Sequence, residues 1–208
     1  MTKTLTTIEP MKSEALYFFP SYIDVNVYIE FSELVFQNPD KIYLILFGNG
    51  GFARVTDAIC SLIMHHGNVE AHLVGDAASC HVRVFSVCQT RYTYPLATIS
   101  LHPSYITGGD DKYDQRDLNS AYLDLKKTDE NALKWLEKAS NKPISWWKKR
   151  YFRSSYLNTL DAKTMIEVGI AEPVPQNMKA KLADVPRFKP SGRPLPESLD
   201  FIEAEQDS

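Results

Sequence analysis

IYLILFGNGG, residues 42–51, is an apolar run (Ile42 to Phe47) that ends in a glycine turn. The segment after it carries apolar residues at helical spacing, namely Ala58, Ile59, Leu62 and Ile63. A second apolar run, Val69 to Val74, follows at the distance that a crossover needs. Because such crossovers are right-handed and join parallel strands, the stretch predicts a βαβ unit in a parallel sheet.

The rest of the chain continues this alternation. A strand-like stretch runs from Ala97 to Leu101, and residues 113–139 read as a helix whose apolar stripe is Ala132, Leu133, Leu136 and Ala139. A last helix is expected from Ala162 to Val168, with Gly169 as its C-terminal cap, followed by a short strand that starts at Ile170. The fold class is therefore expected to be α/β.

Composition sets the broad class of protein. The chain has 208 residues, 44% of them hydrophobic, and a net charge of -3, so we expect a globular protein without a general affinity for nucleic acid or anionic membranes. Its three cysteines form no CxxC pair, which suits a reducing compartment. No apolar run is long enough to span a bilayer or to act as a signal peptide, and we expect a cytoplasmic protein.

The C-terminal region differs in composition from the rest. Six of the twelve prolines lie between Pro173 and Ser208, and residues 197–208 hold five acids and no base. Such sequence buries little apolar surface, so we expect a mobile tail or a docked arm. The expected organisation is an N-terminal arm (1–17), one domain (18–175) and this tail (176–208).

Three features could carry chemistry. The glycine turn presents backbone amides that could bind an oxyanion. Ser79 follows the second apolar run, where ligands of open α/β sheets bind. His102 ends the next strand-like run, and an imidazole at a neighbouring strand end could accept the serine proton. No histidine has metal-ligand spacing with a second ligand, so we expect no metal and no cofactor.

The order of these parts resembles the proteolytic subunit of the Clp protease, a ClpP/crotonase-like fold. Four blocks carry the resemblance: residues 46–51 (LFGNGG), 75–80 (GDAASC), 100–103 (SLHP) and 162–172 (AKTMIEVGIAE). It spans about residues 18–173. It implies a superhelix of βαβ units with a protruding handle helix, and a helix starting at Ser79 although Val82, Val84 and Phe85 favour a strand.

The resemblance also implies roles for individual residues. Ser79 would be the nucleophile and His102 the general base. The amides of Gly51 and Cys80 would form the oxyanion hole. It further implies self-association into rings with the active sites inside, unfolded polypeptide as substrate, and an AAA+ unfoldase as partner.

Two regions depart from the family pattern. The triad aspartate has no counterpart, because residues 153–159 contain no acid. The alternatives are that Asn158, Asp161, Asp110 or Asp111 orients His102, or that no residue does. Asp161 is better explained as the N-cap of the last helix. Residues 104–120 are also more charged than the segment that joins two rings in the family.

The leading hypothesis is a serine endopeptidase subunit that acts through Ser79 and His102 inside a ring. The missing acid motivates a second hypothesis, a weak or silent ring subunit that partners an active paralogue. A phage-type maturation peptidase and a crotonase-type acyl-CoA enzyme are further alternatives. The acyl-CoA enzyme would leave the pairing of serine and histidine unexplained.

Overall fold

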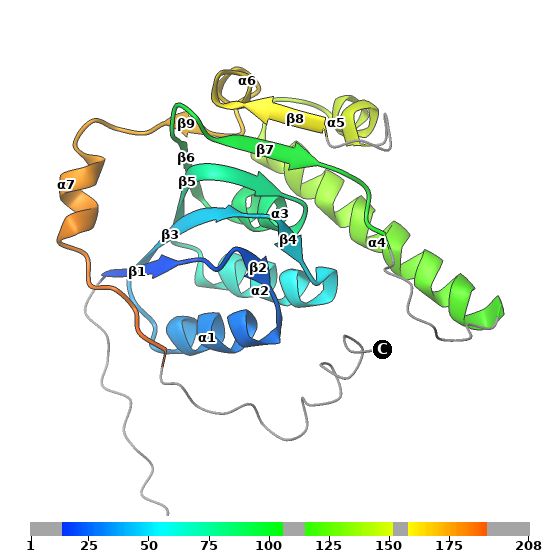
Figure 1. Cartoon of the computed structure of the whole chain (residues 1–208), viewed down its shortest axis with the longest axis horizontal. Coiled ribbons are helices and arrows are strands. Elements are labelled where there is room, and N and C mark those ends of the chain that lie inside the picture. The colour runs from blue at the N-terminus through cyan, green and yellow to red at the C-terminus, as the bar shows by residue number, and fades with distance from the viewer. Residues whose placement is uncertain (1–13, 106–114, 152–157, 191–208) are drawn as a thin grey trace, which may run out of the picture.

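The computed structural model describes residues 14–105, 115–151 and 158–190. In chain order the elements are β1 (Glu14–Phe18), β2 (Tyr22–Ile23), α1 (Val25–Phe36), β3 (Lys41–Gly48), β4 (Gly50–Gly51), α2 (Ala53–His66), β5 (Val69–Ala78), α3 (Cys80–Val87), β6 (Thr90–Thr93), β7 (Thr98–Leu101), α4 (Gln115–Ala139), α5 (Ile144–Tyr151), β8 (Asn158–Asp161), α6 (Ala162–Glu167), β9 (Glu172–Pro173) and α7 (Met178–Ala183). Figure 1 shows α1, α2 and α3 stacked beside successive strands.

Parallel pairing dominates the main sheet. Seven strands of the described residues form it, with the order β1-β3-β5-β6-β9. β3 and β5 are parallel with Ile42 opposite Val69, which confirms the predicted βαβ unit. β7 pairs in parallel with the end of β5, and β8 pairs with β7 in the antiparallel direction. These pairings bring the ends of β5 and β7 side by side.

The two faces of the sheet have different covers. Successive side chains of a strand point to opposite faces, and in β3 Leu44 and Leu46 join the main core with the helices. Tyr43 and Ile45 point to the other face, where Val185 of the C-terminal segment covers them. Each such fully buried Leu contributes about 2 kcal/mol through burial of apolar surface. The core therefore fixes the register of β3, and with it the position of the glycine turn.

Helix α3 forms in spite of strand-like propensity. Its residues Val82, Val84 and Phe85 are all buried, packed between the sheet and the neighbouring helices. Burial of this apolar segment outweighs the small helix penalty of β-branched residues. The expected helix after Ser79 is confirmed, and Cys80 is its first residue.

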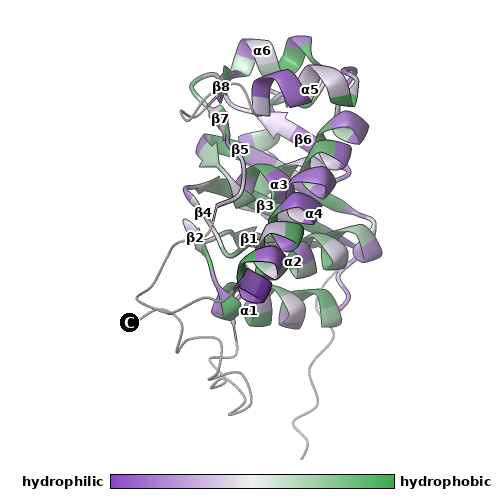
Figure 2. Ribbon diagram, turned by 90° about the vertical axis from the view of Figure 1, so that its right-hand side faces the viewer, coloured by the Kyte–Doolittle hydropathy of each residue, from purple (hydrophilic) through white to green (hydrophobic). Residues whose placement is uncertain are grey.

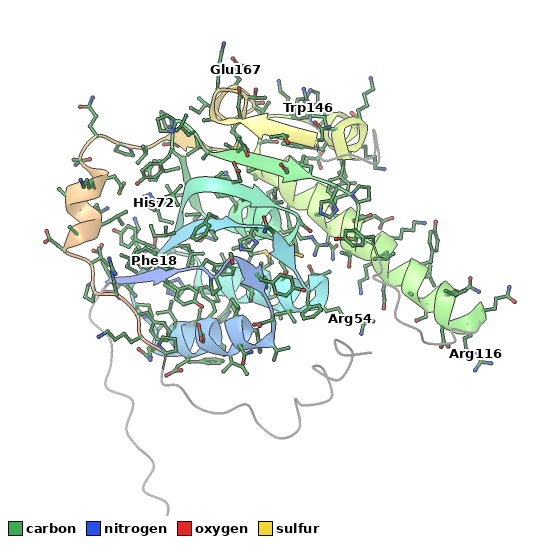
Figure 3. The ribbon with its side chains drawn as sticks, in the orientation of Figure 1. Phe18, Arg54, His72, Arg116, Trp146 and Glu167 are labelled. Carbon is green, nitrogen blue, oxygen red and sulfur yellow. The ribbon has the colours of Figure 1, made fainter. Side chains whose placement is uncertain are left out.

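Helix α4 has an inner half that packs and an outer half that projects. All of its buried residues lie between Thr128 and Ala139, whereas Leu118, Tyr122 and Leu123 are exposed. Figure 3 shows Arg116 at the outer end of the helix, away from the sheet. In Figure 2 the helix is mixed purple and green, as expected of an amphipathic helix. The inner half of α4, from Thr128 to Ala139, packs against α3.

The C-terminal elements differ in detail from expectation. Helix α6 ends at Glu167, with Val168 as its C-cap, and the short strand after it is Glu172–Pro173 rather than one that starts at Ile170. The segment after Pro175 runs back along β1, where Leu16 exchanges backbone hydrogen bonds of 2.8 and 2.9 Å with Pro186 and Phe188. The remainder of the predicted tail, residues 191–208, lies outside the described residues.

Candidate active site

Ser79 occupies a sharp turn between β5 and α3. Its backbone has φ 54° and ψ −118°, a left-handed φ that is unusual for a residue other than glycine. The turn is held by β7, because the Ser79 amide donates to the Ser100 carbonyl at 3.1 Å. β5 was predicted to end at Val74, but it continues to Ala78, so the serine follows the strand directly. A strand end thus delivers the hydroxyl to the N-terminus of a helix.

The glycine turn lies against this serine. A Cβ atom added to Gly50 would lie 2.7 Å from Cβ and 3.1 Å from Oγ of Ser79. At Gly51 it would lie 2.2 Å from the Ile23 carbonyl oxygen, and the φ of Gly51 is +149°. Only glycine fits such close approaches. The turn therefore presents its backbone, not side chains, to the space around Ser79.

The amides of Gly51 and Cys80, which the family resemblance implies as oxyanion donors, lie on β4 and α3. A hydrogen bond from the Cys80 thiol joins these two elements. The Cys80 amide is the first of α3, and the first amides of a helix have no partner within the helix. The Cys80 thiol donates to the Gly51 carbonyl at 3.1 Å, which ties the start of α3 to the glycine turn. Both amides need only main-chain geometry to bind an anion.

His81, which is not among the residues predicted from the sequence, supports the glycine turn. Its ring is fully buried, with Nδ1 accepting from the Gly50 amide at 3.0 Å and Nε2 donating to the Pro20 carbonyl at 2.8 Å. This pattern needs a neutral ring with its proton on Nε2. Burial lowers the pKa of His81 below its ordinary value of 6.5, in agreement. No sequence pattern distinguishes this histidine from an ordinary core residue.

This arrangement makes stability depend on pH. Because the folded-state pKa of His81 is depressed, its contribution is fully present above about 6.5, the unfolded value, and is lost as the pH falls toward the folded-state value. We expect urea unfolding of the wild type to show a falling free energy of unfolding from pH 7 to pH 5, with a weaker fall in His81→Gln. An equal fall in both would contradict this role, and His65→Gln, at the exposed end of α2, is the matched control.

His102 lies at the end of β7, next to the serine turn. Its Nδ1 donates to the Pro103 carbonyl at 2.8 Å, and its ring lies 5.5 Å from the Tyr105 ring. Ser79 and His102 line one small cavity, although no hydrogen bond joins them in the described part of the chain. Catalytic hydrogen bonds of this kind often tighten only when substrate binds. The structure thus brings the predicted nucleophile and base to one cavity.

The shared cavity is small and mixed in character. Its volume is about 10 Å³, which is room for one water molecule. Its walls are Val82, Arg83, Leu101, Ala132, Leu136 and Tyr151, together with the serine and the histidine. A larger cavity of about 410 Å³ lies near Cys88, but that thiol is buried and burial raises its pKa to about 12. The small cavity is therefore the candidate active site.

None of the candidate residues for orienting His102 contacts it among the described residues. Asp161 caps α6, accepting from the Thr164 amide at 2.8 Å, and its carboxylate is exposed. Asn158 lies opposite Leu101 in the sheet, but its amide donates to the Arg150 carbonyl. Asp110 and Asp111 lie outside the described residues.

A buried carboxylate that is not among the predicted site residues, Asp129, lies nearby. Asp129 of α4 is 8% exposed, and its Oδ1 accepts from the Ser104 amide at 2.9 Å and from the Tyr151 hydroxyl at 3.1 Å. It lies three residues before Ala132, on the apolar stripe of the helix. A charged residue on such a stripe is the signal that could have found it.

Ser79 and His102 share one cavity, and the groups around it can be compared with the needs of known reactions. The Ser79 hydroxyl and the His102 imidazole line this cavity, and the Cys80 amide follows directly after Ser79 at the start of α3. A nucleophile, a base and main-chain donors are the groups that attack on a carbonyl needs. No cluster of metal-ligating side chains occurs among the described residues. In that same part of the chain, every helix is too short or too polar to cross a bilayer.

Comparison with known proteins agrees with this geometry. The Clp protease family model matches residues 5–178, which include the glycine turn, Ser79 and His102. A search of curated proteins gave no match. The match spans most of the chain, and the parallel sheet with its stacked helices is the fold expected of that family. The chain therefore belongs to the Clp protease family, which is a family of serine peptidases.

Proposed function

We propose that the chain is an active serine endopeptidase whose nucleophile is Ser79 and whose general base is His102. The hydroxyl oxygen attacks the peptide carbonyl carbon as Nε2 of His102 takes its proton, and the amides of Gly51 and Cys80 stabilise the oxyanion. His102 then gives the proton to the leaving amine. In the second half of the reaction His102 takes a proton from a water molecule, whose oxygen attacks the acyl carbon. The bond to Ser79 breaks, and His102 returns the proton to the serine oxygen.

One observation carries this proposal. The strained turn at Ser79 presents its hydroxyl at a helix N-terminus, beside a glycine turn and in one cavity with His102. Strain of this kind persists where function requires it. A serine that served only as a helix cap would not need φ 54°, and its side chain makes no cap hydrogen bond to α3.

We further propose that the substrate is unfolded polypeptide and that the subunits form a cytoplasmic ring fed by an AAA+ unfoldase. Family membership supports this. The test is incubation with a dye-labelled protein in folded and denatured forms, and release of dye-labelled peptides from the denatured form alone is expected. Release from neither form would contradict the proposal.

Assembly can be tested separately. Leu118, Tyr122 and Leu123 are exposed on the outer half of α4, and such apolar groups are typical of subunit contacts. We expect sedimentation at micromolar concentration to show a closed oligomer. A Tyr122→Asp variant is expected to shift the boundary toward smaller species, because it places a charge in a desolvated contact. A wild-type monomer would contradict the ring.

One observation favours the silent subunit as the second candidate. No carboxylate contacts His102 directly in the described part of the chain. If this subunit is silent, a purified complex should contain a second Clp-type chain with a complete triad. Mass spectrometry of the complex distinguishes the two candidates.

A further inference from the structure

A single peptide group lies between His102 and a buried carboxylate. The carbonyl of Pro103 accepts from Nδ1 of the histidine at 2.8 Å. The amide of Ser104, which belongs to the same peptide group, donates to Oδ1 of Asp129 at 2.9 Å. In a trans peptide the C=O and N–H bonds point in opposite directions, so this group bridges its two partners.

Asp129 is held firmly in this position. It is buried, and the Tyr151 hydroxyl donates to the same Oδ1 at 3.1 Å. Burial and then the charge of Asp129 raise the pKa of Tyr151 well above its ordinary value, so the phenol stays a donor. These two hydrogen bonds fix the position of the Asp129 carboxylate.

We propose that Asp129 takes the place of the triad acid and acts on His102 through the peptide group between Pro103 and Ser104. The inference rests on the proposed function, because it assigns a positioning residue to the same site. The carbonyl fixes the ring with its proton on Nδ1 and leaves Nε2 free to take the serine proton. The charge of Asp129 polarises the peptide and so strengthens that hydrogen bond.

The charge also favours the imidazolium that forms during catalysis. When Nε2 takes the Ser79 proton, the ring becomes positive one peptide group away from a carboxylate in a region of low dielectric. The proton on Nδ1 stays on the histidine throughout. Asp129 touches neither the substrate nor the reacting atoms, and its effect is orientation and electrostatic stabilisation.

Other charged groups around the site are engaged elsewhere. Arg83, which is buried in the cavity wall, donates to Asp57 at 3.1 Å and to the Thr128 carbonyl at 3.2 Å. It therefore ties α3 to α2 and α4, with its charge paired by Asp57. Asp161 is fully exposed at the start of α6. Asp129 is thus the buried carboxylate whose hydrogen bonds lead to His102.

The sharpest variant is Asp129→Asn. Both hydrogen bonds reach Oδ1, and an asparagine Oδ1 can accept both, so the variant removes the charge and leaves the geometry. Asp129→Ser, which also keeps an acceptor, is the second variant should the first not fold. Asp161→Asn is the matched control, because it removes an exposed carboxylate and asparagine still caps a helix.

The experiment has two readouts, the pH titration of the His102 ring and the reactivity of Ser79. The full chain is labelled with 13C-histidine, and its five ring signals are titrated, with His102 assigned by the signal lost in His102→Gln. We expect the titration midpoint of His102 to move about one unit toward lower pH in Asp129→Asn and to stay in place in Asp161→Asn. An unmoved midpoint in Asp129→Asn overturns the inference.

The reaction of Ser79 with a fluorophosphonate gives the second readout. Its rate constant at neutral pH should fall about tenfold in Asp129→Asn, with the acidic limb of its pH profile displaced to lower pH. A purely structural role would lower the rate without moving the limb. If the wild type does not react at all, the proposed function fails, while the titration of His102 still decides the role of Asp129.

Discussion

Ser79→Ala is expected to lower peptide hydrolysis by roughly a thousandfold or more, because the variant has no oxygen to form the acyl intermediate. The fold should survive the change, since the half-buried side chain makes no cap hydrogen bond and alanine removes only its hydroxyl group. The measurement is the initial rate on a fluorogenic peptide, with circular dichroism to confirm folding.

Ser100→Ala is the matched control for this prediction. Its side chain lies on β7, where it hydrogen bonds to Thr159 at 3.0 Å, and only its backbone carbonyl contacts the Ser79 turn. We expect its rate to remain within about twofold of the wild type, as for most surface substitutions. Full activity in Ser79→Ala, or equal losses in both variants, would remove the basis for Ser79 as nucleophile.

Gly51→Ala is the second prediction with a large effect. The added Cβ would lie 2.2 Å from the Ile23 carbonyl oxygen, and alanine rarely adopts a φ of +149°. We expect a loss of about 3 kcal/mol or more in the free energy of unfolding. Because the turn must shift, its amide also leaves the oxyanion position, and hydrolysis should fall at least about a hundredfold.

Gly67→Ala is the control for Gly51→Ala, because it causes backbone strain without a steric clash. Gly67 has φ +76° at the end of α2, but a Cβ there would meet nothing closer than 4.0 Å. We expect a cost of about 1 kcal/mol and unchanged activity per folded molecule. Thermal unfolding and initial rates of the two variants give the comparison, and similar behaviour of both would show that the contact with Ile23 does not matter.

The sequence predicts the fold well wherever periodicity is strong. The βαβ unit of residues 42–74 and the helix of residues 115–139 follow from the spacing of apolar residues alone. The helix after Ser79 does not, because its valines favour a strand and only burial between sheet and helices makes it helical. There the family resemblance supplied what local propensity could not.

The two side chains proposed to react could be predicted from the sequence, whereas the residues that support the site could not. Ser79 and His102 are each recognisable at a strand end, and parallel pairing of those strands brings them together. His81 and Asp129 make long-range hydrogen bonds, across 31 residues to the Gly50 amide and 25 residues to the Ser104 amide. No short sequence pattern encodes contacts of that kind.

The central claim is that His102 activates Ser79, and fluorophosphonate labelling of the full chain tests it most directly. Intact mass and peptide mapping should show one adduct, located at Ser79, that is absent in Ser79→Ala and forms far more slowly in His102→Ala. An adduct that persists in Ser79→Ala, or the absence of any adduct on folded wild-type protein, would contradict the account.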